Sequence, residues 1–149
     1  MFELMTALHL LAAVFVIGPL VHAVTTSGRA LRRRDAAAAG AAARMTRIYA
    51  YASVAVVVFG FGLMSATSPY SGQKVAEFAE TWIWLSVLLW LIGAVVALVV
   101  TAPALASAAE RIRADTALGS IKGRVLGSGM AVAVVFVVII VLMVYQPGS

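Results

Sequence analysis

Two histidines, His9 and His22, are the only imidazole side chains in the 149-residue chain, and both fall in the apolar stretch ALHLLAAVFVIGPLVHA (residues 7–23). A neutral imidazole can ligate haem iron or copper, so these residues are the first candidates for chemistry. Their spacing of 13 positions (22 − 9) corresponds on an α-helix to about 20 Å of rise and roughly 220° of rotation. The two imidazoles therefore cannot ligate one metal or one haem within a single chain.

His9 is the better candidate ligand, because three methionines are expected at its depth. Met5 lies one helical turn before it, and Met64 and Met143 end two other apolar runs on the same side. Thioether sulfur with imidazole suits Cu(I), and His/Met pairs also hold haem. We therefore predict His9 as a haem b or copper ligand, with the three methionines as further copper ligands. Two plainer interpretations stay open: methionine fills gaps in apolar packing, and a histidine can hydrogen-bond to a neighbouring helix.

His22 lies at the other end of the same stretch, close to Arg29. A polar residue at the membrane interface explains it most simply. Between the histidines, the pair Gly18-Pro19 predicts a kink, because proline cannot donate the backbone hydrogen bond to the carbonyl of Phe15.

The elements that carry these residues must lie in lipid. Hydrophobic residues make up 63% of the chain and charged residues only 11%, against roughly 45–50% and about 25% in soluble domains. With no cysteine, the chain has no disulfide, zinc–thiolate site or Cys-ligated iron–sulfur cluster. The net charge of +5 is explained by orientation in the membrane rather than by nucleic acid.

Four apolar runs reach the length of about 20 residues that a spanning helix needs. They cover residues 4–26, 48–67, 81–101 and 127–145, and we predict an all-α membrane four-helix bundle. The last three runs contain no Asp, Glu, Lys, Arg or His. This argues against a proton relay, a charged ion pathway or a hydrolase triad, all of which need polar partners across the bundle.

The basic residues predict the orientation of the bundle. Segments 27–47 and 102–126 hold ten bases, whereas the connection 68–80 holds only Lys74 beside Glu77 and Glu80. The positive-inside rule then places both basic loops in the cytoplasm and both termini outside. Abundant arginine, alanine and valine suggest a GC-rich bacterial genome and hence a bacterial inner membrane. The basic loops could also attract anionic lipid.

The basic segments are predicted to be helical hairpins, because they are rich in alanine. We expect tight turns near Arg34-Asp35 and Ala114-Asp115, with both aspartates as helix N-caps. A shift of 80 residues superposes the two segments, Asp35 falling on Asp115. Two tandem repeats of one hairpin or two unrelated hairpins with basic loops would both give this pattern.

Aromatic and small residues fit the same plan. Trp82, Trp84 and Tyr145 stand where interfacial anchors are expected. As an alternative, Trp82, Trp84 and Trp90 could line a groove for a quinone or porphyrin. Glycines and alanines in the second and third runs, such as those of FGFGLMSA (residues 59–66), allow close helix contact.

The stretches LHLLAAVFVIGPLVHA and ETWIWLSVLLWLIG together resemble the integral membrane family known as domain of unknown function 2269 (DUF2269). That family is similar in outline to the CopD copper-resistance proteins and to the HemJ-type protoporphyrinogen oxidases. The resemblance implies the four-helix layout and a ligand role for His9. HemJ-type proteins also use a lysine within the bundle, and the absence of one here argues against oxidase activity.

We expect a small non-catalytic inner-membrane protein that serves as an accessory or assembly subunit, with a membrane protein or a second copy as partner. The alternative is a haem b- or copper-binding protein with His9 as ligand. A small transporter ranks third.

Overall fold

The computed structural model describes residues 1–70, 72, 74, 76–77 and 80–147, and these residues form four long helical rods. The first and third rods each change from α- to π-helix and back. In chain order the elements are α1 (Phe2–Ala12), η1 (Ala13–Ile17) and α2 (Gly18–Arg32) in the first rod, α3 (Ala36–Met64) in the second, α4 (Thr81–Val95), η2 (Val96–Thr101) and α5 (Ala102–Arg113) in the third, and α6 (Ser120–Tyr145) in the fourth.

The rods contain 31, 29, 33 and 26 residues, and each is long and apolar enough to cross a membrane. The chain is therefore an all-α, four-span integral membrane protein, as its composition predicted. Every rod exceeds the roughly 20 residues that cross the hydrocarbon core. The predicted spans 4–26, 81–101 and 127–145 lie within these rods, and most of segments 27–47 and 102–126 continues the helices. The predicted span 48–67 is too long at its end, because α3 stops at Met64.

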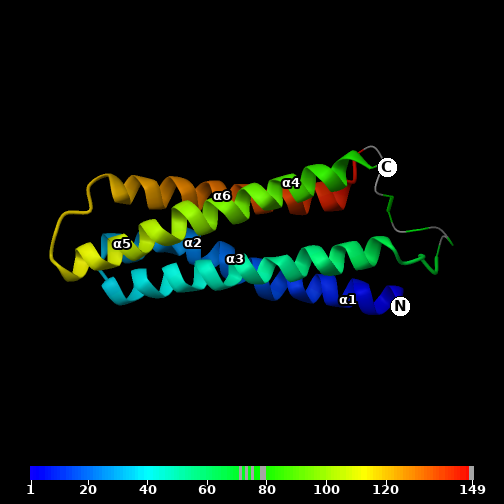
Figure 1. Cartoon of the computed structure of the whole chain (residues 1–149), viewed down its shortest axis with the longest axis horizontal. Coiled ribbons are helices and arrows are strands. Elements are labelled where there is room, and N and C mark those ends of the chain that lie inside the picture. The colour runs from blue at the N-terminus through cyan, green and yellow to red at the C-terminus, as the bar shows by residue number, and fades with distance from the viewer. Residues whose placement is uncertain (71, 73, 75, 78–79, 148–149) are drawn as a thin grey trace.

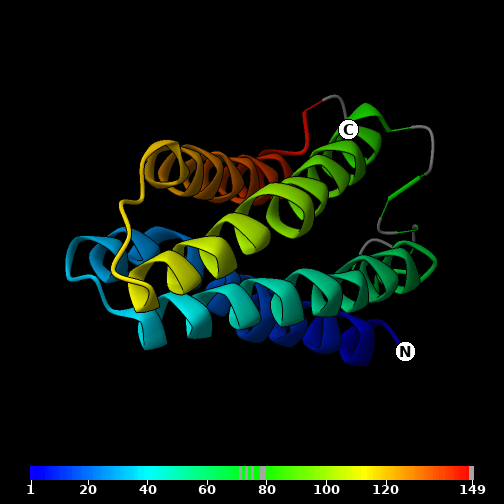
Figure 2. The same cartoon turned by 60° about the vertical axis from the view of Figure 1, so that its left-hand side comes forward.

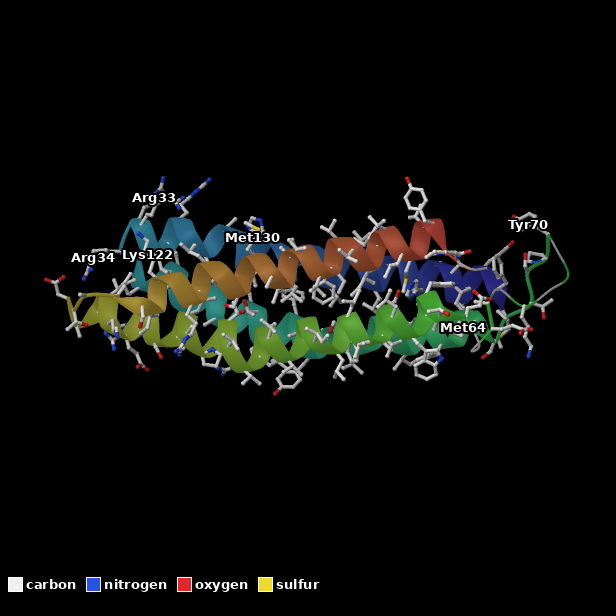
Figure 3. The ribbon with its side chains drawn as sticks, turned by 90° about the horizontal axis from the view of Figure 1, so that it is seen from above. Arg33, Arg34, Met64, Tyr70, Lys122 and Met130 are labelled. Atoms are coloured by element: carbon white, nitrogen blue, oxygen red, sulfur yellow. The ribbon has the colours of Figure 1, made fainter. Side chains whose placement is uncertain are left out.

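The bundle has two chemically different ends (Figure 3). The turns at 33–35 and 114–119 lie at one end, which we call the basic end because arginines and Lys122 surround it (Figure 3). The start of α1, the end of α6 and the described residues between α3 and α4 lie at the other, which we call the terminal end (Figure 1). In this connection Thr67 forms an antiparallel bridge with Lys74. The predicted loop 68–80 lies partly outside the described residues.

A π-helical turn precedes a proline in both composite rods. η1 ends directly before Gly18-Pro19, and η2 ends two residues before Pro103. A proline ring clashes with the carbonyl four residues earlier and removes one backbone hydrogen bond. Widening the preceding turn to a π-helix accommodates this disruption. The kink predicted at Pro19 is thus a π-bulge, and the sequence did not reveal the second bulge before Pro103.

The two turns at the basic end share one backbone geometry. Arg34 and Asp115 both adopt positive φ, at 51° and 50°. In each turn a backbone N–H donates to a carbonyl of the preceding helix: the N–H of Asp35 donates to the carbonyl of Ala30, and that of Thr116 donates to the carbonyl of Arg111. This is the left-handed cap that ends many helices. The corresponding residues are therefore offset by 81 positions (115 − 34), not by the predicted 80.

The two aspartates consequently have different roles. Asp35 is the N-cap of α3 and accepts a hydrogen bond from the backbone N–H of Ala38 at 2.9 Å, as predicted. The prediction for Asp115 is wrong, because Gly119 is the N-cap of α6. Asp115 occupies the left-handed position of the previous helix cap, and its carboxylate instead accepts a hydrogen bond from Arg34 at 2.9 Å. The second turn is wider than predicted and extends from 114 to 119.

The basic half of the bundle is closely packed. α2, α3, α5 and α6 meet there, and small side chains allow their backbones to approach. Gly129 shows how close the approach is, because a Cβ at this position would lie 2.9 Å from the backbone oxygen of Val24. A hydrophobic cluster forms the core of this half, and its buried residues are Ala30, Leu31, Ala39, Ala43, Ala104, Leu105, Ala108, Ala109, Ile112 and Val125.

The terminal half is more open. There α1 packs on α3 and α4 packs on α6, and the two pairs diverge with little contact between α3 and α4 (Figure 2). α1 contains no buried residue. A small cluster of Met64, Ala76, Trp82 and Ile83 closes the base of the connection. Many apolar side chains of this half are exposed and face lipid in a membrane.

Candidate functional site

His9 lies on α1 in the terminal half and is half-buried against α3. Its Nδ1 is 2.9 Å from the backbone oxygen of Val56. A carbonyl oxygen can only accept, so Nδ1 carries the hydrogen and donates it. The histidine therefore hydrogen-bonds to a neighbouring helix, which was one of the plainer interpretations.

Two glycines of α3 admit the side chains of α1. A Cβ on Gly60 would lie 3.2 Å from Cε1 of His9, and a Cβ on Gly62 would lie 3.1 Å from Sδ of Met5. Both distances are tighter than ordinary packing. The motif FGFG thus provides two neighbouring recesses for residues one turn apart on α1.

The hydrogen bond also fixes the tautomer of His9. In the neutral ring with Nδ1 protonated, Nε2 carries the lone pair. Histidines that ligate metals commonly donate their other ring N–H to a carbonyl or carboxylate in this way. The arrangement is therefore chemically compatible with a ligand role for Nε2.

The structure places the predicted methionine ligands in three different settings. Met5 faces Gly62, Met64 is buried in the cluster at the terminal end (Figure 3), and Met143 is exposed on α6. Since α6 packs with α4 while α1 packs with α3, helix packing alone does not bring Met143 to His9. The copper site formed by His9, Met5, Met64 and Met143 stays a prediction.

His22 is remote from this site. It lies on α2 and is exposed, and its carbonyl accepts hydrogen bonds from the hydroxyls of Thr26 at 2.7 Å and Thr25 at 3.2 Å. These bonds are local to the helix and involve no imidazole nitrogen. An exposed polar residue near the basic end agrees with the interfacial interpretation.

Two further polar contacts join different rods, and sequence reasoning missed both. Trp90 donates its indole N–H to Oγ of Ser53 at 2.9 Å, so this tryptophan ties α4 to α3. The hydroxyls of Thr101 and Ser128 are 2.9 Å apart and tie η2 to α6. The available signal was the presence of serine and threonine inside apolar runs, where hydroxyls often bond across helices.

The three predicted interfacial anchors divide into two groups. Trp84 and Tyr145 are exposed, as an interfacial anchor must be. Trp82 is buried beside Met64, and its indole N–H donates to the carboxylate of Glu80. The expectation of a lipid-facing anchor at Trp82 is therefore wrong, because the connection before α4 covers it.

In comparisons with known proteins, no family model, curated protein or solved structure matches this chain. Among the described residues, no group of three or more His, Asp or Glu side chains is arranged to hold a metal ion.

Proposed function

We propose that this four-span protein is a non-catalytic accessory or assembly subunit of a bacterial inner-membrane complex. In this proposal the basic end faces the cytoplasm and both chain ends face outward, as the distribution of bases favours. The observation that supports the role best is the use of the polar side chains in the spans. His9, Trp90 and Thr101 each form a hydrogen bond to another rod, so they act as ties within a scaffold.

In this proposal a partner helix packs on α6. Beyond its own helix backbone and chain neighbours, an added Cβ at Gly123 or Gly127 meets no atom of the described residues within 4 Å. A second helix could therefore approach this backbone closely. By contrast, Gly129 on the same helix is covered by α2.

The test is purification from native membranes in mild detergent, followed by identification of bound polypeptides. We expect another membrane protein in fixed stoichiometry, and we expect Gly127→Leu to release it. Ala7→Leu is the matched control, because Ala7 is also exposed but lies on α1. A lone monomer recovered from native membranes would contradict the proposal.

A second candidate function follows from the geometry of His9. We propose haem b or copper binding through Nε2 as the alternative, supported by the bond from Nδ1 to Val56. As part of this alternative, we propose that the chain is related to the DUF2269, CopD and HemJ-type proteins.

A visible spectrum and metal analysis of the purified protein distinguish the two candidates. The alternative predicts a Soret band or bound copper that His9→Ala abolishes and His22→Ala retains. Colourless, metal-free protein from cells supplied with haem precursor and copper would exclude it.

A further inference from the structure

A groove of about 270 Å³ lies between the third rod and α6. Its lining includes neither His9 nor the two glycines, Gly123 and Gly127, of the partner face proposed above. Its position is where the apolar part of α6 gives way to the basic end. The lining residues are Val99, Val100, Pro103, Ala104, Ser107, Ile121 and Arg124.

The groove exists because α5 and α6 are held together at two points and separate between them. On the apolar side, the hydroxyls of Thr101 and Ser128 are hydrogen-bonded. On the basic side, the turn 114–119 joins the helices, and Arg111 braces it by donating to the carbonyl of Ala117 at 3.1 Å. Between these points the facing residues of α5 are small, so the gap is not filled by side chains.

The lining changes in polarity along its length. Val99 and Val100 line the end towards the membrane centre, and Val99 is 68% exposed. Ser107 and Arg124 are the lining residues with polar side chains, and along α5 and α6 they lie on the basic side of the contact between Thr101 and Ser128. An occupant that fits this gradient has an anionic head and an apolar tail.

The charges around the polar end favour an anion. Between residues 102 and 126 the chain has four bases (Arg111, Arg113, Lys122 and Arg124) and two acids (Glu110 and Asp115). Asp115 already accepts a hydrogen bond from Arg34. Arg124 is exposed, and no ion pair involves it among the described residues. Its planar fork of donors matches the oxygens of a phosphate.

We propose that this groove is a binding site for one anionic phospholipid. The phosphate accepts hydrogen bonds from the guanidinium of Arg124 and the hydroxyl of Ser107, and an acyl chain lies along Val99 and Val100. Pockets for whole ligands measure roughly 300–1,000 Å³, so this groove holds the head and the upper part of one chain. The rest of the lipid remains in the bilayer.

The test measures lipids that remain bound to the full chain in native mass spectrometry. The protein is mixed in detergent with phosphatidylglycerol or with phosphatidylcholine. We expect wild type to retain phosphatidylglycerol preferentially. Arg124→Gln should weaken this retention about tenfold, as expected for loss of one charge-assisted contact.

Lys122→Gln is the matched control, because it removes one positive charge from the same helix, two residues away and outside the groove lining. It should retain the lipid. Ser107→Leu should displace the lipid by filling the groove, without any change in charge. Circular dichroism and gel filtration establish that each variant is folded.

Three results would overturn the proposal. Equal weakening by Lys122→Gln and Arg124→Gln would mean diffuse attraction to the basic end. Undiminished retention in Ser107→Leu would mean that the groove is not occupied. Displacement of the lipid by inorganic phosphate alone would identify free phosphate as the ligand.

Discussion

The basic and terminal halves of this bundle use similar apolar residues but are stabilised differently. In the basic half four rods pack on one another, and Leu105 is completely buried. In the terminal half two helix pairs diverge, and Leu88 is 53% exposed (Figure 2). Lipid is as apolar as leucine, so burial from lipid gives little stability by itself, and close packing provides it instead. We therefore expect the basic half to contribute more to the free energy of unfolding than the terminal half.

The strongest test of this comparison replaces a leucine in each half. Leu105→Ala should lower the free energy of unfolding by about 2–5 kcal/mol, because it leaves a cavity in a packed cluster. Leu88→Ala should have little effect, because lipid or detergent occupies the space. Unfolding in detergent, followed by circular dichroism, measures both. Equal losses would contradict the proposed difference between the halves.

Two glycines of α6 sharpen the comparison within one helix. Gly129→Ala places a Cβ 2.9 Å from the backbone oxygen of Val24, and we expect a loss of about 1–3 kcal/mol from overpacking. Gly127→Ala places a Cβ that meets no described atom within 4 Å beyond the backbone of α6 and the chain neighbours. It should stabilise the isolated protein slightly, because alanine favours helix. The same denaturation assay compares them. If Gly129→Ala leaves the free energy of unfolding unchanged, the backbones of α2 and α6 are not in close contact at this position.

Two buried threonines should respond in opposite directions to replacement by valine. Thr46 is fully buried, and its hydroxyl has no hydrogen-bond partner among the residues that the structure describes. Thr46→Val should therefore raise the free energy of unfolding by about 1 kcal/mol. Thr101→Val should lower it by a similar amount, because the bond to Ser128 is lost. A loss of stability in Thr46→Val would show that the hydroxyl has a partner after all.

The ion pair between the two basic turns should have the smallest effect. Asp115→Asn removes the charge that faces Arg34 but keeps a residue that tolerates positive φ. We expect a loss of less than about 1 kcal/mol, and it should disappear at high salt. Urea unfolding at low and high salt measures this. A large loss that salt does not reduce would mean that the turn geometry depends on the carboxylate.

The local signals in the sequence were the most informative. Asp35 followed by an alanine run predicted the N-cap of α3, because capping depends on residues three positions apart. The same reasoning was wrong for Asp115, since the chain continues for four residues before α6 begins. The π-bulge before Pro103 was missed, because a proline changes the helix in a way that depends on how the neighbouring rods pack.

The candidate site was only partly predictable. His9 stood out in the sequence as a rare polar residue in an apolar run. A hydrogen bond from it to a neighbouring helix was one of the predicted interpretations. Nothing in the sequence indicated that the partner is the carbonyl of Val56 or that Gly60 makes room for the ring. Such a contact joins residues 47 positions apart, and it depends on the rotation of two helices about their axes.

By itself, the sequence determined the solvent of this protein, its four helices and the segregation of its bases at one end. These properties follow from composition, from run length and from the need to satisfy backbone hydrogen bonds in lipid. The tertiary structure alone decided which glycines are covered, that the terminal half is open, and that a groove forms beside Arg124. The physical reason is that these features arise from the crossing and rotation of rods, and many apolar sequences satisfy the same local pattern with different packing.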